Sequence, residues 1–276
     1  MISGTPTHAG RTLGWWCRKH DIPVERYAHG GDRGTHLDYG WDLVELPFCS
    51  RYVTHGALER DNFAARAATG AICRNFPEHP VFATSGSPKH QEIYRKTLNS
   101  KVPPGAVRRL LYVPGLYVTE RVPLSPIFKT PDHLYAEWQL WFVKALKQQG
   151  YDVTIKLHPD GIEKGAAVFN QSDCRLLDGY LDPTRNEYGC RVFDFPGSAW
   201  FDSLASNAAM VLVDLGARKL DPRSAELVRR RCPIVPSTQD DANRLRANLE
   251  DIDSAIAAAQ QNPGCNTAEA RQLFWH

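Results

Sequence analysis

The stretch DVTIKLHP, residues 152–159, points most directly to the fold class of the chain. Its first six residues form a short apolar run that is typical of a buried strand. His158-Pro159 follows and ends the strand in a turn. A second run of the same kind, RLLYV at residues 109–113, stops at Pro114-Gly115. Both runs predict buried strands of one sheet, with turn residues at their ends.

A helix is predicted between these two strands. Thr130 suits its N-cap, Pro131 its first helical position and Asp132 the positive end of the helix dipole. Gly150 suits the position just after the helix. Apolar residues recur between these ends at helical spacing, so the aromatic residues of the pattern are interpreted as core. They are Trp138, Trp141 and Phe142.

The same alternation continues toward the C-terminus. Strands are predicted at residues 190–195, 210–214 and 233–235, helices at 200–208 and 224–231, and one or two polar helices at 240–261. Alternation of this kind favours a parallel sheet with helices on both faces, which binds ligands beyond the carboxyl ends of its strands. Three predicted strand ends fall on that edge: Pro114-Gly115, His158-Pro159 and Asp214-Leu215-Gly216.

The first 105 residues show a partial version of this pattern. A helix is predicted at 11–20, and strands at 22–27, 43–48, 51–53 and 80–84. Residues 100–105 contain two prolines and a glycine and predict a linker. The sequence therefore predicts a partial Rossmann-like domain at residues 1–105 and a complete one at 106–276. The abrupt start MISG predicts a first domain that is truncated or completed by a partner chain.

Composition argues against several classes of protein. The 276 residues carry 33 Lys and Arg against 31 Asp and Glu, and a net charge of +2 is too small for a protein that binds nucleic acid through bulk charge. No stretch has the roughly 18 to 20 apolar residues of a membrane span, and the first residues lack the features of a signal peptide. The seven cysteines form no CxxC pair, which disfavours a zinc knuckle and fits a reducing cytoplasm.

Two histidines are the main candidates for chemistry. His158, at the end of a buried parallel strand, is placed to donate a hydrogen bond to a phosphate, and the alternative is a surface histidine without a ligand. His29 opens a glycine-rich loop at residues 29–34, whose backbone N–H groups can approach an anion. His29 and Asp32 are the candidate general bases of this loop, and the alternative is a polar surface loop.

The segment after Asp214 is the third candidate. Arg218 and Lys219 are placed to meet a diphosphate, and Glu226 is placed to bind ribose hydroxyls. The alternative for Arg218, Lys219 and the basic run at residues 229–231 is a solvated face, which is the usual fate of a charge run. The run at 229–231 is also suited to contact with anionic membrane lipid.

The order of these motifs resembles that of bacterial surface-polysaccharide transferases of the GT-B fold. A His-Gly loop comes first, then SGSP at 85–88, LYVPG at 111–115 and VTIKLHP at 153–159, and a later strand ends in Asp214. The group includes capsule and lipopolysaccharide glycosyltransferases, sialyl- and Kdo-type transferases and teichoic-acid glycerophosphotransferases. The resemblance spans residues 20–240 through short motifs, of which K-x-HP is moderately specific for the group.

The resemblance implies an α/β, GT-B-like fold in which two Rossmann-like domains face each other across a cleft. The C-terminal domain would bind the nucleotide-linked donor and the N-terminal one the acceptor. His158 would contact the donor phosphate, Pro114-Gly115 would form the first loop of the donor domain, and His29 would act as base or phosphate contact. No metal or other cofactor is expected, because helix N-termini and cationic side chains stabilise the leaving phosphate in such enzymes.

The candidate residues fall into two groups by expected role. The candidate catalytic residues are His29 and Asp32. The candidate substrate-binding residues are Gly30, Gly31, Arg33, Pro114, Gly115, Lys156, His158, Pro159, Ser206, Asp214, Gly216, Arg218 and Glu226. Ser206 and Arg218 are included because Leu215-Gly216-Ala217 stands where the family commonly has a Ser or Thr phosphate contact.

These features favour a glycosyltransferase that moves a sugar from a CMP-, UDP- or GDP-linked donor to a glycan or a lipid-linked glycan, with inversion of the anomeric carbon. Three alternatives stay open. They are transfer of glycerol phosphate from CDP-glycerol, a sugar epimerase on the same fold, and a catalytically degenerate module that binds a partner chain or a glycan. A cytoplasmic location is expected, and the composition permits peripheral contact with the inner face of the plasma membrane.

Overall fold

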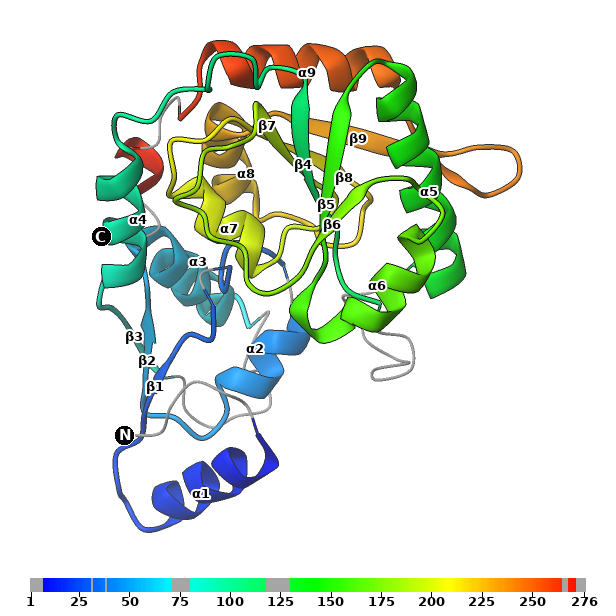
Figure 1. Ribbon diagram of the computed structural model, residues 1–276. Helices are drawn as coiled ribbons and strands as arrows, with labels where there is room; N and C mark the ends of the chain where they lie inside the picture. The colour runs from blue at the N-terminus through cyan, green and yellow to red at the C-terminus, as the bar shows by residue number, and fades with distance from the viewer. Residues whose placement is uncertain are drawn as a thin grey trace. The chain divides into compact units, whose positions relative to one another are not determined.

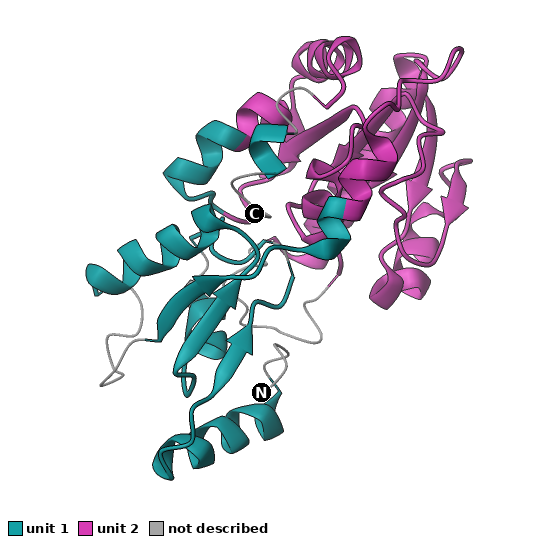
Figure 2. Cartoon of the chain, turned by 90° about the vertical axis from the view of Figure 1, so that its left-hand side faces the viewer, with its two compact units in different colours: residues 1–91, 219–227, 268–276 teal, residues 92–218, 228–267 magenta. Residues whose placement is uncertain are grey.

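The computed structural model describes residues 7–30, 32–37, 39–70, 80–117, 130–264 and 268–271 (Figure 1). The chain divides into two compact units (Figure 2). Unit 1 comprises Met1–Gln91, Lys219–Leu227 and Ala268–His276, and unit 2 comprises Glu92–Arg218 and Val228–Thr267. These units differ from the predicted ranges because two later segments of the chain cluster with the N-terminal part.

Unit 2 is built on a seven-stranded sheet. Its strands, in spatial order, are β10 (Leu245–Ala247), β9 (Ile234–Gln239), β8 (Met210–Asp214), β7 (Cys190–Phe193), β4 (Arg109–Val113), β5 (Asp152–Lys156) and β6 (Arg175–Leu177). All neighbours pair in parallel except β10, which is antiparallel to β9. The parallel strands follow the order of a doubly wound Rossmann sheet, with β4 as the first strand in its centre.

Helices cover both faces of this sheet. α5 (Asp132–Gln148), α6 (Ile162–Phe169) and α9 (Leu249–Gln261) form one core cluster with alternate strand residues such as Leu110 and Tyr112. The intervening residues of each strand face the other side of the sheet. There the guanidinium of Arg191 lies 3.4 Å from the Ser203 hydroxyl in α7 (Ser198–Leu204). The sheet is therefore buried on both faces, which explains why its strands are continuous apolar runs.

Unit 1 is built on a three-stranded parallel sheet of β1 (Glu25–Tyr27), β2 (Arg51–Thr54) and β3 (Val81–Thr84), in that order. Its helices are α1 (His8–Lys19), α2 (Tyr39–Glu45) and α3 (Ala57–Ala68), and α4 (Pro88–Thr97) begins in it. Tyr52 and Phe63 pack edge to face in its core, with ring centroids 5.1 Å apart. Among the described residues, no helix is both long and apolar enough to cross a bilayer.

Most strand predictions are confirmed. β4 and β8 have the predicted bounds, and β2, β3, β5 and β7 lie where the apolar runs place them. The strand predicted at residues 43–48 is wrong, because this segment is the end of α2 and a turn. A short apolar run fits a strand or a helix equally well. The prediction of only helices at 240–261 is also wrong, since β10 precedes α9 there.

The basic run at the end of α8 (Pro222–Arg231) is not a uniform solvated face. Arg229 and Arg230 are exposed, but Arg231 is only 4% exposed. Its guanidinium donates to the carbonyl of Leu204 at 3.2 Å and to those of two residues after α7. Arg231 therefore satisfies carbonyl groups that the end of α7 leaves without helical partners. The prediction that Arg231 contacts membrane lipid is therefore wrong, because its guanidinium is held inside the protein.

Candidate functional site

The carboxyl ends of β4, β5 and β7 form the central edge of the unit 2 sheet. β4 lies between β5 and β7, so the direction of the strand order reverses at this position. Doubly wound sheets bind their ligands outside this topological switch point. Pro114-Gly115 follows β4, His158 lies just beyond β5 and Asp194 follows β7. The residues predicted from the first two strands therefore share one edge with an aspartate that was not predicted.

Asp194 is a buried carboxylate at the centre of this edge. It is 1% exposed and accepts hydrogen bonds from the hydroxyls of Tyr112 and Tyr135, from Trp138 Nε1 at 3.2 Å and from the Gly115 N–H at 3.0 Å. Burial raises the pKa of Asp194, and the hydrogen bonds oppose this rise. The carboxylate therefore ties β4, the turn after it and α5 to the end of β7.

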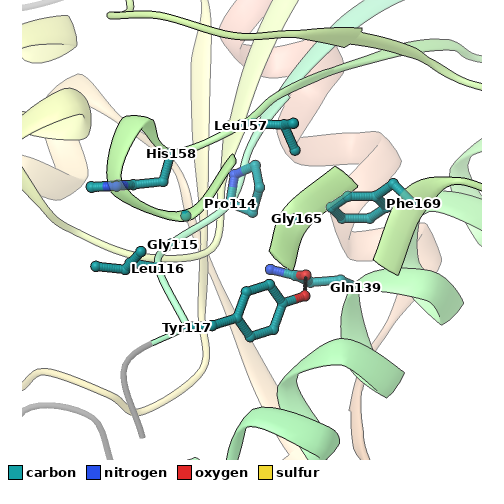
Figure 3. Close-up of a pocket in the computed structure, with 10 residues that line it drawn as sticks. Pro114, Gly115, Leu116, Tyr117, Gln139, Leu157, His158, Gly165 and Phe169 are labelled. Carbon is teal, nitrogen blue, oxygen red and sulfur yellow. Dashed lines mark hydrogen bonds between the residues drawn. The ribbon is translucent and has the colours of Figure 1, made fainter. Parts of the chain in front are cut away.

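A small, open hollow lies beside this network (Figure 3). The turn after β4, the end of β5 and α6 line it, and the Tyr117 hydroxyl donates to Gln139 at its side. In Figure 3 the His158 ring lies on the opposite side of Pro114 from Phe169. His158 is one of the residues that line the hollow, and the others are mostly apolar side chains and glycines. We call this feature the His158 hollow.

One ring nitrogen of His158 is hydrogen-bonded to the backbone. Its Nδ1 accepts a hydrogen bond from the Asp160 N–H at 3.1 Å and caps the short helix η1 (Pro159–Gly161), whose first residue is the predicted Pro159. Burial lowers the pKa of His158, Asp160 raises it and Lys156 lowers it, with a lower pKa as the result. A neutral imidazole whose Nδ1 accepts carries its proton on Nε2. His158 is therefore a neutral N–H donor, which suits a phosphate oxygen.

Glycines let the walls of the His158 hollow approach closely. A Cβ on Gly115 would lie 2.9 Å from the Cβ of Phe195, and one on Gly161 would lie 2.7 Å from Leu116 Cδ1. The Gly115 N–H also lies 2.6 Å from the Tyr135 hydroxyl, in addition to its bond with Asp194. The Gly115 N–H, which the sequence placed in a loop that binds the nucleotide donor, is therefore bonded within the Asp194 network. Gly115 contributes to this edge of the sheet through its small size.

We expect Gly115→Ala to lower the free energy of unfolding by about 2 kcal/mol, because the added methyl group overlaps Phe195 and overpacking of this kind strains its surroundings. Urea unfolding followed by circular dichroism measures the change. Gly216→Ala is the matched control, since Gly216 has φ +70° but open space where a Cβ would lie. It should lose only the backbone strain, about 1 kcal/mol. A Gly115→Ala protein as stable as the wild type would contradict the packing seen here.

Asp214 and Gly216 form a turn at the end of β8. The Asp214 carboxylate accepts a hydrogen bond from the Gly216 N–H at 2.8 Å, and the positive φ of Gly216 explains why a glycine stands there. Arg218, further along, is 5% exposed and donates to the Pro196 carbonyl at 2.7 Å. Arg218 therefore anchors the loop after β7, and the interpretation of a solvated face is wrong for it.

Ser206 lies at the wrong end of its strand for a phosphate contact. It is fully buried in the turn before β8, which places it at the amino end of the sheet. Its hydroxyl donates to the Ser203 carbonyl at 2.7 Å and lies 3.4 Å from Arg191. The prediction that Ser206 contacts donor at the carboxyl edge is therefore wrong.

Lys156 turns toward a second, larger hollow of unit 2. Its ammonium group donates to the carbonyls of Leu157 and Gly179, and its side chain lines a space of about 880 Å³ together with Asp178. Burial lowers the pKa of Lys156, and Asp178 opposes this. Lys156 is not among the residues that line the His158 hollow. A shared phosphate contact for Lys156 and His158 therefore lacks structural support.

Glu226 is exposed in the second turn of α8, which begins at Pro222 rather than near Ser224 as predicted. It belongs to unit 1, whereas His158 and Asp214 belong to unit 2. Its assignment to ribose hydroxyls stays a prediction.

The glycine-rich loop at residues 29–34 follows β1 in unit 1. His29 is exposed, and its N–H lies 3.5 Å from Glu45 Oε2. Gly30 has φ +86°, and Gly34 has φ +81° and packs so closely that a Cβ would lie 2.9 Å from the Phe63 ring. Gly31 lies outside the described residues. These two glycines are therefore explained by backbone conformation, and anion binding by the loop stays a prediction.

Asp32 and Arg33 are buried in a cluster of ion pairs. Arg33 lies 3.1 Å from Asp32 Oδ2 and 2.7 Å from Glu45 Oε1, and the Tyr52 hydroxyl donates to the other Glu45 oxygen. Burial acts to lower the pKa of Arg33, but the two carboxylates outweigh it and raise the pKa. Asp32 is 3% exposed and paired with Arg33, so its carboxylate is buried away from an incoming acceptor hydroxyl. The structure therefore argues against Asp32 as the general base and against Arg33 as a substrate contact.

Two histidines of unit 1 were not predicted. His55 follows β2 and His90 lies in the first turn of α4, and their ring centroids are 5.9 Å apart. His55 Nδ1 lies 3.9 Å from buried Glu59, and His90 Nδ1 lies 2.7 Å from the Ser87 hydroxyl. Because β1, β2 and β3 are parallel, His29 and His55 lie at the same edge of this sheet. Its position just after a predicted strand was the signal that could have found His55, whereas His90 lies in a helix and gave no such signal.

The residues described by the structure contain no group of three or more His, Cys, Asp or Glu side chains placed to hold a metal ion. The candidate sites are therefore described through hydrogen-bonding groups: His158 and the Asp194 network in unit 2, and the histidines at the carboxyl edge of the unit 1 sheet.

No protein-family model and no curated protein matches the chain. Among solved structures it is similar to the UDP-GlcNAc 2-epimerase of Methanocaldococcus jannaschii, which was crystallised with UDP-GlcNAc and UDP. The identity is 13%, the match covers 96% of this chain and 70% of the epimerase, and the TM-score is 0.50. The likeness shows the fold, which is α/β and GT-B-like with Rossmann-like parallel sheets. The fold class that the resemblance implied is thereby confirmed.

Two further solved structures have lower TM-scores. Anabaena Alr3699/HepE in complex with UDP-glucose is 12% identical, with 97% of this chain and 73% of that chain covered and a TM-score of 0.48. The wall teichoic acid polymerase TagF is 12% identical, with 93% and 64% covered and a TM-score of 0.46.

Proposed function

We propose that the chain is a glycosyltransferase that moves a sugar from a nucleotide-linked donor to a surface-polysaccharide acceptor. The observation that carries the proposal is the His158 hollow at the topological switch point of unit 2. A neutral N–H donor beside a glycine-rich wall suits the diphosphate of such a donor. The structure of the M. jannaschii epimerase, which has the same fold, holds UDP-GlcNAc and UDP, so this fold accommodates a nucleotide sugar.

In the proposed reaction an acceptor hydroxyl attacks the anomeric carbon of the donor sugar. The new bond joins the acceptor oxygen to that carbon, and the bond from the carbon to the diphosphate oxygen breaks. The electron pair of the broken bond stays on the diphosphate, and the hydroxyl proton passes to a general base. His158 Nε2–H would donate to the diphosphate as its negative charge increases. A single displacement of this kind inverts the anomeric carbon.

His29 is the proposed general base. It is exposed at the end of β1, whereas Asp32 is buried in its pair with Arg33. The proposed acceptor is a glycan or a lipid-linked glycan, and the proposed location is cytoplasmic. Metal-independent transfer is part of the proposal, because His158 Nε2–H is the group assigned to the leaving diphosphate.

The proposal is tested by incubating the purified protein with CMP-, UDP- and GDP-linked sugars, each with and without a panel of polysaccharide acceptors. Release of nucleotide that depends on an acceptor, with sugar found on the acceptor, is the expected result. Three further outcomes would contradict glycosyl transfer and identify what replaces it. Turnover of CDP-glycerol but of no nucleotide sugar indicates a glycerophosphotransferase, and UDP release without any acceptor indicates an epimerase. Nucleotide binding without turnover of any donor would indicate a degenerate binding module.

A further inference from the structure

α1 carries three large apolar side chains that are exposed among the described residues. Leu13 is 51% exposed, Trp15 43% and Trp16 48%. Two other residues attach the helix to unit 1, because Gly14 is buried and Cys17 packs against the core cluster that includes Val24. α1 therefore holds two tryptophans and a leucine at the surface by means of a fixed helix rather than a loose chain end.

The charges of α1 are all of one sign. Its ionised side chains are Arg11, Arg18 and Lys19, and residues 7–20 contain no Asp or Glu. Lys19 Nζ lies 4.5 Å from the centroid of the Trp15 ring, so a cation and an exposed aromatic ring share one place on the helix. A partner that complements this surface must therefore offer both apolar contact and negative charge.

An open hollow lies beside the same tryptophan. The residues that line it are His8, Arg11, Thr12, Trp15 and Phe48. The Nε atom of Arg11 has no hydrogen-bond partner within the described part of the chain. The hollow thus places a guanidinium group next to an indole ring, which matches a phosphate group attached to a hydrocarbon chain.

We propose that α1 docks unit 1 on an anionic lipid bilayer. Tryptophan side chains prefer the boundary between headgroups and acyl chains, and basic side chains are drawn to the negative surface of such a bilayer. The bilayer would take up Leu13, Trp15 and Trp16 on its apolar side and pair its phosphates with Arg11 and Lys19. This surface is distinct from the basic run at 229–231, and the inference does not depend on the proposed transferase activity.

The test is co-sedimentation of the full chain with vesicles of phosphatidylglycerol and, separately, of phosphatidylcholine. The wild type should pellet with phosphatidylglycerol and stay in the supernatant with phosphatidylcholine. Trp15→Ser combined with Trp16→Ser should weaken binding at least ~10-fold, because the buried indole area is lost. Arg11→Gln combined with Lys19→Gln should weaken it about 25-fold at low salt, since each of the two cations contributes about 5-fold near an anionic surface.

Leu140→Ser combined with Tyr180→Ser is the matched control, because these side chains are 42% and 90% exposed on unit 2. It should bind phosphatidylglycerol like the wild type, and circular dichroism checks that each variant is folded. Equal binding to both lipids, no binding to either, or wild-type binding by the double tryptophan variant would overturn the proposal. Sedimentation velocity tests whether α1 binds a second copy of the chain instead of a bilayer. A wild-type dimer that the tryptophan variant loses would assign α1 to that second copy.

Discussion

Replacing Asp194 by alanine is expected to lower the free energy of unfolding by about 4 kcal/mol, because it removes the acceptor from a buried network. The hydroxyls of Tyr112 and Tyr135, Trp138 Nε1 and the Gly115 N–H all donate to this carboxylate. Without it these donors stay buried and lose their shared acceptor. Urea unfolding followed by circular dichroism measures the loss.

Asp214→Ala is the control for this experiment. Asp214 also follows an apolar run and ends a parallel strand, but its side chain accepts a single N–H bond, from the exposed turn at Gly216. Its loss should lower the free energy of unfolding by about 1 kcal/mol. If both substitutions had the same small effect, the Asp194 network would not hold the edge of the sheet together.

Asp194→Asn adds a pH test with a definite sign. The pKa of Asp194 is raised in the folded protein by burial, so above the ordinary pKa of an aspartate the folded chain binds more protons at this site than the unfolded chain does. The stability that this carboxyl contributes is therefore greatest at low pH and falls as pH rises toward its folded pKa. The difference in the free energy of unfolding between the wild type and Asp194→Asn should therefore become smaller as pH rises from the ordinary pKa of an aspartate toward the folded pKa of Asp194. A difference that widened with rising pH would contradict the raised pKa.

Replacing His158 by alanine is expected to weaken binding of the donor nucleotide diphosphate about 10- to 100-fold, the effect of losing one hydrogen bond to a charged group. Nδ1 of His158 is occupied by the Asp160 N–H, so Nε2–H is the group that remains for a ligand. His158→Gln keeps an amide N–H donor at a similar distance and should recover part of the affinity. Isothermal titration calorimetry measures both variants.

His133→Ala is the matched control, since His133 is an exposed histidine in the first turn of α5 and does not line the His158 hollow. It should bind the nucleotide like the wild type. If His158→Ala also bound like the wild type, the role assigned to His158 would be wrong, whatever reaction the protein catalyses.

The strands of unit 2 could be predicted from the sequence because a sheet buried on both faces leaves continuous apolar runs. β4 and β8 were bounded correctly for this reason, and His158 could be placed because it directly follows such a run. The strand predicted at 43–48 failed because a short apolar run does not distinguish strand from helix. The topology that brings β4 between β5 and β7 depends on long-range pairing that no local pattern encodes.

The side-chain partners were harder to predict than the strands. Asp194 was interpreted as part of a strand, whereas β7 ends at Phe193, and its partner Tyr112 lies 82 residues away in the sequence. Arg218 was expected to meet a diphosphate, and a solvated face was the alternative for Arg218 and Arg231, but both donate to backbone carbonyls inside the protein. The wrong assignment of Ser206 could have been avoided, since a residue that precedes a strand lies at the amino end of that strand.

The central claim, that the carboxyl edge of the unit 2 sheet binds the nucleotide of a sugar donor, is tested most directly by a melting-temperature screen of the wild type with CMP, CDP, UDP and GDP. A ligand that binds the native state must raise the melting temperature when it is present well above its dissociation constant. We predict that at least one of these nucleotides raises it, and that His158→Ala reduces that rise while His133→Ala preserves it. A wild-type melting temperature that none of the four nucleotides changes would contradict the account.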